Sequence, residues 1–274
     1  MRRTTPLATL LLFALISACA GRGPGAAIAL DVATTTSVQN SGLLDVLLPR
    51  YAHADIRIHP VGSGLSLKML ETRQVSAVIA HAPLAEAGYL ARHPDWSYRK
   101  IAFNRFTMVG PAGDPARVAD APDVLTAFQR IAASRAFFVS RGDQSGTHER
   151  ELSIWKSAGV TMPPDRVITS GSSMAVALRH ADEKQAYTIS DEATFWQLQQ
   201  KLSLVQLRTA DPELLNTYAV IHAAGDEAAS AFASWLSTGE GRELIGGYQI
   251  RRRQAFTPWP RDCPNESPSA QPCG

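Results

Sequence analysis

An excess of charge of one sign is missing from this sequence of 274 residues. Its 27 basic and 25 acidic side chains give a formal net charge of +2 at pH 7. A protein that binds nucleic acid by neutralising phosphates needs a larger basic excess, so we expect no nucleic-acid partner. With 45% hydrophobic and 19% charged residues, the chain is suited to a sizeable core rather than to global disorder.

Motifs for metal, nucleotide and nucleophile chemistry are also absent from the sequence. The seven histidines show no HxH or HExxH spacing and the three cysteines form no CxxC pair, so we expect no metal and no cofactor. The segment GSGLSLK lacks P-loop spacing. Ser145 lies three residues before His148, but GDQSG is not the GxSxG turn of a hydrolase. We therefore expect a protein that is not an enzyme, with a hydrolase as the alternative.

A long hydrophobic run is lacking, and a short one lies at the start of the chain. Two arginines precede an apolar stretch from Leu7 to Ile16, which is too short to span a bilayer stably. We interpret residues 1–18 as a signal peptide. The junction ISAC resembles a bacterial lipobox, which predicts lipid modification of Cys19, a linker over residues 19–27, and a periplasmic protein anchored to the membrane. Ordinary secretion with an incidental cysteine is the alternative.

Two cysteines are left if Cys19 carries lipid. Cys263 and Cys273 both lie in a Pro/Ser-rich tail, which we place at residues 258–274. In an exported protein such a pair predicts a disulfide. Two free thiols in a disordered tail are the alternative.

Short apolar segments alternate with helix-like segments along the rest of the chain. The first set predicts strands near residues 28–33 and 55–60, a helix between them that breaks late at Pro49, and a third strand in VSAVIAHAP. This βαβαβ order is typical of an open parallel sheet. A second set follows FTMVGPAGDP, and an apolar strand returns in YAVIHAAG. We predict an α/β protein of two lobes: lobe I (residues 28–110 and 216–257) and lobe II (residues 111–215).

Four of the predicted strands end in a polar turn before a helix. These turns are TTTS, VGSGLS, SRGDQSGTH and SGSSM. The carboxyl ends of parallel strands form the edge where ligands bind in open α/β sheets. Helix N-termini present unpaired N–H groups there, so the four turns together with Arg141 predict a site for an anion. Helix capping by Ser and Thr explains each turn alone, and pairing with Asp143 or Glu149 explains Arg141 alone.

Six segments strongly resemble the tungstate-binding proteins of Tup-type ABC transporters. They are ATTTSVQNSGLLDVLLP, VGSG, AHAPLAE, FVSRGDQSGTHERELSIWKSAG, EKQAYTISDEATF and FASWLSTGEGRELIGGY, and they span nearly all of residues 28–257 in order. The resemblance implies a type II periplasmic-binding-protein fold, with two α/β lobes around a ligand cleft joined by two hinge strands. It also implies a membrane permease and an ATPase as partners. We expect a monomer.

The resemblance carries ligand-binding roles to seven residues of the TTTS and SRGDQSGTH turns: Thr35, Thr36, Ser37, Arg141, Ser145, Gly146 and Thr147. We add Ser63 and Ser172 from the other two turns, which gives nine expected ligand residues. Three positions depart from the usual family pattern: Ser63 replaces the threonine of VGTG, the turn GSSM around Ser172 replaces GQGM, and Arg105 replaces an acidic residue. These departures leave the fine selectivity of the site open.

The anion that the site prefers depends on whether that anion carries a proton near neutral pH. Tungstate and molybdate are fully deprotonated near neutral pH, so a site made of N–H groups, hydroxyls and a guanidinium suits them. Monohydrogen phosphate carries a proton that needs an acceptor. Asp143 could be that acceptor, and the run around it resembles that of phosphate-binding proteins, so phosphate is the alternative ligand. Otherwise Asp143 caps the helix or holds Arg141. A further alternative function is a lipoprotein that senses the ligand without serving a transporter. Such a protein would have the same binding pocket.

Overall fold

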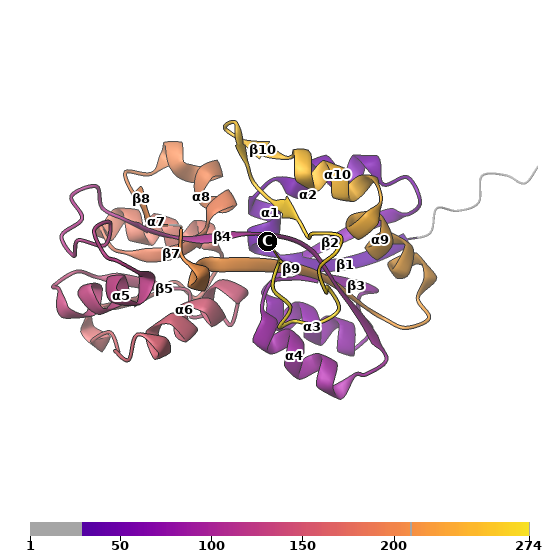
Figure 1. Ribbon diagram of the computed structural model, residues 1–274, viewed down its shortest axis with the longest axis horizontal. Coiled ribbons are helices and arrows are strands. Elements are labelled where there is room, and N and C mark those ends of the chain that lie inside the picture. Colours follow the sequence, from indigo (N-terminus) through magenta and orange to yellow (C-terminus); the bar gives the residue numbers. More distant parts are fainter. Residues whose placement is uncertain (1–28, 209, 274) are drawn as a thin grey trace, which may run out of the picture.

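The computed structural model describes residues 29–208 and 210–273, in two groups of helices and strands that lie side by side (Figure 1). The predicted signal peptide, the linker and Cys19 lie outside the described residues. Within those two ranges, no helix has both the length and the apolar character needed to cross a bilayer.

The larger sheet belongs mainly to lobe I and has the strand order β12-β4-β9-β3-β1-β2. β1 pairs in parallel with both β2 and β3, whereas β9 runs antiparallel to β3 and β4. The parallel βαβαβ start that the sequence predicted is therefore confirmed. The strands are β1 (Ala29–Thr35), β2 (Asp55–Val61), β3 (Ala77–Ala80), β4 (Trp96–Gly110), β9 (Leu215–Ala223) and β12 (Thr257–Pro258).

The helices of lobe I are mostly short. The single helix predicted before Tyr51 is wrong: it is divided at Gly42, whose φ of +78° a helix cannot contain. Pro49 lies in a closing 3-10 turn, as its position predicted. The elements are α1 (Thr36–Asn40), α2 (Leu43–Leu47), η1 (Leu48–Arg50), α3 (Ser63–Glu71), α4 (Pro83–Arg92), α9 (Glu227–Thr238) and α10 (Glu240–Gly247), followed by the hairpin β10 (Gln249–Ile250) and β11 (Arg253–Gln254).

Lobe II contains two smaller groups of strands. β7 and β8 pair with the far end of β4, while β5 and β6 form a parallel pair that a bridge from Phe138 to Tyr187 joins to the segment before β7. The strands are β5 (Phe138–Ser140), β6 (Val167–Thr169), β7 (Thr188–Asp191) and β8 (Val205–Arg208). The helices are α5 (Val124–Ala133), α6 (Gly146–Ser157), η2 (Pro164–Arg166), α7 (Met174–Lys184), α8 (Glu192–Leu198), η3 (Gln199–Lys201) and η4 (Pro212–Leu214).

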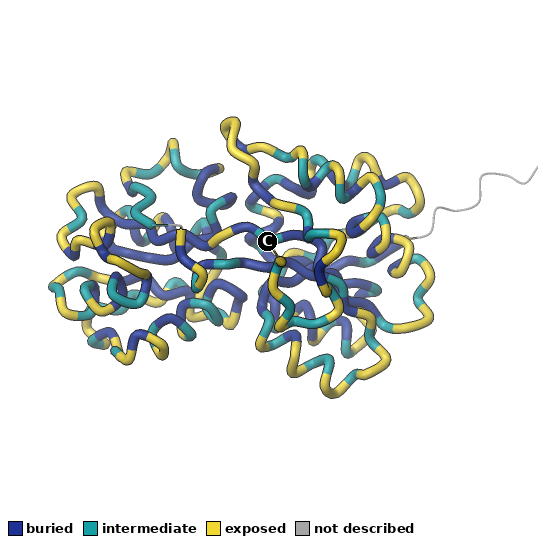
Figure 2. The backbone as a smooth tube through the Cα atoms, in the orientation of Figure 1, coloured by how far each residue is buried: buried dark blue, intermediate teal, exposed yellow. Residues whose placement is uncertain are grey.

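Strands β4 and β9 connect the two lobes. β4 pairs with β9 as far as Arg105 and with β7 from Phe106 to Val109, so one continuous strand takes part in both sheets. Both strands run through the middle of the molecule and are mostly buried there (Figures 1 and 2). The lobes therefore share a two-strand connection, the arrangement that allows hinge closure.

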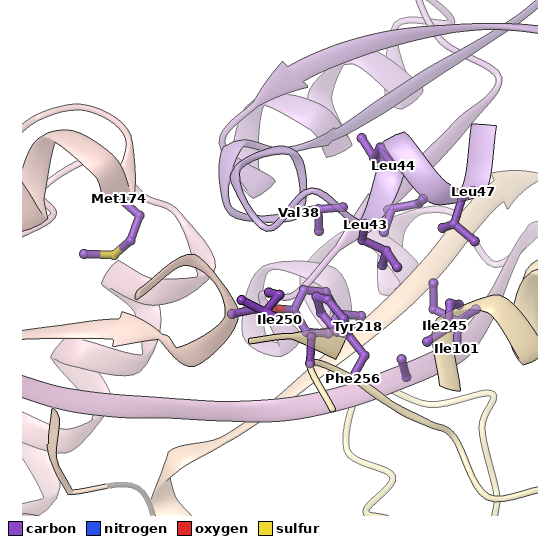
Figure 3. Close-up of a cluster of buried hydrophobic side chains, with 14 of the residues drawn as sticks. Val38, Leu43, Leu44, Leu47, Ile101, Met174, Tyr218, Ile245, Ile250 and Phe256 are labelled. Carbon is purple, nitrogen blue, oxygen red and sulfur yellow. The ribbon is translucent and has the colours of Figure 1, made fainter. Parts of the chain in front are cut away.

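The largest apolar cluster crosses between the lobes. It includes Val38 of α1 and Tyr218 of β9 together with Met174 of α7; Figure 3 shows Met174 on the lobe II side, set apart from the grouped lobe I side chains. A second cluster lies within lobe II and a third within lobe I. Because the shared cluster holds α1 against α7, the lobes are in contact at the end of β1.

The tail packs against β4 rather than extending away from it. Trp259 is 2% exposed, and its indole N–H donates to the carbonyl oxygen of Pro264. Lys100 of β4 donates from Nζ to the carbonyl oxygen of Pro268 at 2.9 Å. Cys263 and Cys273 are joined as a disulfide.

Candidate functional site

The strand ends of lobe I face the start of α6 in lobe II. A methyl group added at Gly62, at the end of β2, would lie 3.6 Å from the carbonyl oxygen of Asp143. A methyl group added at Gly146, the first residue of α6, would lie 2.1 Å from the carbonyl oxygen of His81, directly after β3. The backbones of the two lobes thus touch at these turns, which is a closed arrangement.

Arg141 is the buried cation of this region. It follows β5 directly and is 1% exposed. Its Nη2 donates to Asp143 Oδ2 at 2.5 Å, and its Nε donates to the carbonyl oxygen of Ser172 at 3.0 Å. Nη1 lies 3.5 Å from the sulfur of Met174. A guanidinium has five N–H donors, so these contacts orient Arg141 and leave donors for a further partner.

The turn after β5 also fixes Asp143 and Glu151. The second oxygen of Asp143 accepts from the backbone N–H of Ser145 at 3.2 Å, so Asp143 holds both Arg141 and the start of α6. Glu151 accepts from the backbone N–H of Arg141 at 3.0 Å, and burial raises the pKa of this carboxyl to about 7. Glu149 does not pair with Arg141, because it accepts from two backbone N–H groups at the start of α4.

Two of the predicted hydroxyl residues act as helix caps. Thr35 Oγ1 accepts from the backbone N–H of Val38 at 3.2 Å, and Ser145 Oγ accepts from that of His148 at 3.3 Å. These hydroxyls satisfy N–H groups that a helix start leaves unpaired. The capping interpretation therefore explains part of the turn chemistry.

Three other hydroxyls are buried without a partner. Ser63 Oγ, Thr147 Oγ1 and Thr34 Oγ1 have no hydrogen-bond partner within residues 29–208 and 210–273. Thr34 belongs to the TTTS turn but was not among the residues predicted to bind. An unpaired buried polar group costs about 1–3 kcal/mol, and such groups are rare in folded proteins. Ser63 and Thr147 adjoin the glycines at which the backbones of the two lobes meet, so two of these hydroxyls lie at the contact between the lobes.

The remaining predicted residues lie around this centre. Ser37 is buried, and its carbonyl oxygen accepts from Thr194 Oγ1 of α8 at 3.3 Å. Thr36 is half-buried at the start of α1. Ser172 is exposed and reaches Arg141 through its carbonyl oxygen rather than its hydroxyl. The structure therefore brings the predicted residues to one region, with the side chain of Ser172 at its rim.

A buried polar network lies behind the strand ends. His81 Nδ1 is 3.0 Å from Asn216 Oδ1, and Asn216 Nδ2 donates to Asn104 Oδ1 and to Tyr218 Oη. Asn104 Nδ2 lies 3.4 Å from Asp191 Oδ1, at the start of α8. The network thus runs from lobe I through both connecting strands to lobe II. Sequence reasoning missed His81, although its place after a wholly apolar strand marks a further strand end.

Acidic and histidine side chains do not gather as metal ligands. In the described part of the chain, no group of three or more His, Cys, Asp or Glu residues could hold a metal ion. The contact region combines the Arg141 guanidinium with hydroxyl groups and with the carboxylate of Asp143 that holds it.

Comparison with known proteins gives consistent matches. A family model described as the PBP superfamily domain matches residues 23–240. The tungstate-binding protein TupA of Peptoclostridium acidaminophilum is 35% identical over 241 residues, which are 83% of this chain and 84% of the relative. The crystal structure of the tungstate ABC transporter from Geobacter sulfurreducens has a TM-score of 0.73 and 33% identity, covering 80% of this chain and 98% of that one. TupA from Desulfovibrio alaskensis G20 has a TM-score of 0.70 and 32% identity, covering 85% and 99%.

Proposed function

Because the chain belongs to the PBP superfamily and, within it, to the tungstate-binding protein family of ABC transporters, we propose that it captures tungstate between its lobes. The bound anion is then delivered to a membrane permease driven by an ATPase. One observation carries the proposal: the buried Arg141 lies at the contact between the lobes, where the hydroxyls of Ser63 and Thr147 are buried with no hydrogen-bond partner among the described residues.

The donors in this region favour an anion without protons. The guanidinium donates only, and the free hydroxyls can turn their hydrogens toward a guest. Each oxygen of Asp143 accepts one hydrogen bond, from Arg141 and from the backbone N–H of Ser145, which is the supporting role expected of a residue that holds the turn. The 35% identity to a tungstate-binding protein supports tungstate over phosphate. Molybdate has the same charge, and we propose it as a second ligand.

Closure of the lobes couples binding to delivery. Four of the nine proposed ligand residues lie on turns of lobe I and five on turns of lobe II, so only the closed form offers all of the donors at once. An anion that bridges the lobes stabilises that form by its differential affinity. We propose that the closed monomer is what the permease recognises.

The proposed location follows from the N-terminal segment. Export to the periplasm with a lipid on Cys19 would keep the protein close to the permease. Palmitate labelling in cells, repeated with Cys19→Ala, tests the anchor: loss of label in the variant is expected, and a labelled variant would contradict it.

Titration calorimetry with tungstate, molybdate, sulfate and phosphate tests the proposed ligand. We expect tungstate to bind with a Kd below about 1 µM, equivalent to about 8 kcal/mol, and sulfate and phosphate to bind more weakly. Tight binding of phosphate with no binding of tungstate would overturn the proposal in favour of a phosphate-binding protein.

A further inference from the structure

We propose that His81 is a further anion-binding residue, which contacts the anion through Nε2 and takes up a proton as a fully deprotonated anion enters. The inference rests on the proposed function and deepens it. It identifies a third strand end of lobe I as part of the site and makes binding depend on pH.

The position of His81 places it between the lobes. β3 runs parallel to β1, so His81 leaves the sheet at the same edge as the TTTS turn. Its carbonyl oxygen faces Gly146 at the start of α6. The imidazole is 1% exposed and stacks on Tyr218, with the ring centroids 5.1 Å apart.

The hydrogen bonds behind His81 determine which nitrogen of the neutral ring carries its hydrogen. Asp191 Oδ1 accepts from backbone N–H groups of α8, so Asn104 directs its NH₂ toward Asp191 and its oxygen toward Asn216. Asn216 then uses its NH₂ for Asn104 and Tyr218 and offers its oxygen to His81. Nδ1 of His81 is therefore the donor.

The other ring nitrogen is left with a lone pair. Nε2 is buried and has no hydrogen-bond partner in the described part of the chain. A lone pair repels an oxygen of a fully deprotonated anion, whereas a protonated Nε2 donates to it. A neutral ring would instead suit an anion that carries its own proton, such as hydrogen phosphate. The protonation state of His81 thus distinguishes the two classes of ligand.

The charged groups around the imidazole of His81 determine how its pKa responds when the anion binds. Burial and the nearby Arg141 lower the pKa of His81 to about 4, while Asn216 and Asp143 act in the opposite direction. The ring is therefore neutral near pH 7 before the anion enters. A dianion at hydrogen-bond distance favours the charged ring and raises its pKa. Ionisable groups near His81 include Glu86, Arg141, Asp143, Glu149, Arg150, Asp191 and Tyr218.

The sign of the pH dependence follows from this linkage. Since binding raises the pKa of His81, the contribution of the ring to affinity is complete below the pKa of the free protein, about 4. It is lost as the pH rises through the higher pKa of the complex. Between the two values, binding takes up one proton, so the association constant falls by about tenfold for each unit by which the pH rises.

Proton uptake can be measured directly in the full protein. We would titrate it with tungstate at pH 7 in Tris and in PIPES, whose ionisation enthalpies differ, and then repeat the titration at higher pH. We expect uptake approaching one proton per tungstate and an affinity that falls with rising pH. His81→Gln should bind about tenfold more weakly, as loss of a charge-assisted bond implies, and should take up no proton. His53→Gln, at an exposed histidine of lobe I, should match the wild type in both measurements.

The outcomes separate this inference from the proposed function. Tungstate binding without proton uptake overturns the role of His81 and leaves the proposed function intact. Uptake that persists in His81→Gln overturns it as well. Absence of tungstate binding by the wild type contradicts the proposed function itself. If His81→Gln does not fold, the imidazole ¹⁵N resonances of the wild type decide, since a ring that stays neutral in the tungstate complex contradicts the inference.

Discussion

The two sides of the proposed site differ in how their polar groups are held. On the lobe II side, Arg141, Asp143 and Ser145 bond to one another and to neighbouring backbone groups. On the lobe I side, Ser63 Oγ and His81 Nε2 are buried and have no hydrogen-bond partner in the part of the chain that the structure describes. The lobe II side thus presents a charged group that is already held in position. The lobe I side presents neutral groups that have no partner among the described residues.

This difference suggests a division of roles between the lobes. A guanidinium already fixed by Asp143 loses little conformational freedom when an anion arrives, so its charge is available for affinity. The neutral groups of lobe I cost free energy until a guest of the right hydrogen-bonding pattern meets them, so they favour selectivity and closure. Two residues depart from this division: Thr147 Oγ1 of lobe II has no partner among the described residues, and Thr35 Oγ1 of lobe I accepts from the backbone N–H of Val38. Substitutions on the two sides should therefore have effects of different size.

Removal of the Arg141 charge should have the largest effect on affinity. Arg141→Gln is expected to weaken tungstate binding by about 2–4 kcal/mol, since a charge-assisted contact in a buried site is lost and Asp143 keeps its charge nearby. Titration calorimetry measures the change. Arg179→Gln, at an exposed arginine of α7, is the matched control and should bind like the wild type. An Arg141→Gln variant that folds and binds normally would show that the charge on lobe II is not the anchor.

Blocking the contact between the sides should have the next largest effect. In Gly146→Ala the new methyl group would lie 2.1 Å from the carbonyl oxygen of His81, so the closed arrangement would have to open. We expect weaker tungstate binding by about 1–3 kcal/mol, the usual cost of such overpacking. Alanine is a good helix residue, so the ligand-free protein should unfold at a similar temperature.

The control for Gly146→Ala is a glycine in open space. Apart from its chain neighbours, no atom of the described residues lies within 4 Å of a methyl group added at Gly113, so Gly113→Ala should leave tungstate affinity unchanged. Small-angle X-ray scattering should show that Gly146→Ala stays extended when tungstate is added, whereas the wild type contracts. Contraction of both proteins would contradict the proposal that closure brings the two sides together at Gly146.

Much of the fold was predictable because apolar runs and polar turns alternate clearly. The parallel start of the sheet followed from three short apolar segments, each ended by a turn residue such as Gly62. The strand β4 was not predicted, because it changes sheets at Arg105 and so shows no single hydrophobic period. The break at Gly42 was also missed, since an isolated glycine in a helical pattern is often tolerated.

The candidate site was predictable to the extent that its residues lie in turns with hydroxyls and glycines. Arg141 and Thr147 belong to such a turn. His81 does not, because a histidine after an apolar strand gives no capping signal and its role depends on Asn104 and Asn216. Those partners are far away in the sequence and meet His81 only through the pairing of β9 with β3 and β4.

Removal of a single unpaired hydroxyl should weaken tungstate binding less than the changes above, and it should leave the stability of the ligand-free protein unchanged or higher. Ser63→Ala and Thr147→Val are each expected to weaken tungstate binding by about 0.5–1.5 kcal/mol. Both should leave the ligand-free protein as stable as the wild type or more stable, because an unsatisfied buried group is removed.

Thr35→Val is the contrasting variant. The hydroxyl of Thr35 caps α1, so its removal should lower the free energy of unfolding by about 1 kcal/mol. Chemical denaturation with and without tungstate measures both quantities. A loss of stability in Ser63→Ala would indicate a bonded hydroxyl and weaken the comparison between the sides.

Opening the tail should have the smallest effect on affinity, because the tail belongs to neither side of the site. Its disulfide encloses a loop with a sequence separation of 10 residues, for which chain entropy predicts a stabilisation of about 2–3 kcal/mol. Cys263→Ser combined with Cys273→Ser should therefore lower the free energy of unfolding by that order and leave the tungstate affinity unchanged. The tail also contacts Lys100, on one of the two strands that connect the lobes. A marked fall in affinity in the double variant would mean that the tail controls the hinge, so that the site depends on a third region besides its two sides.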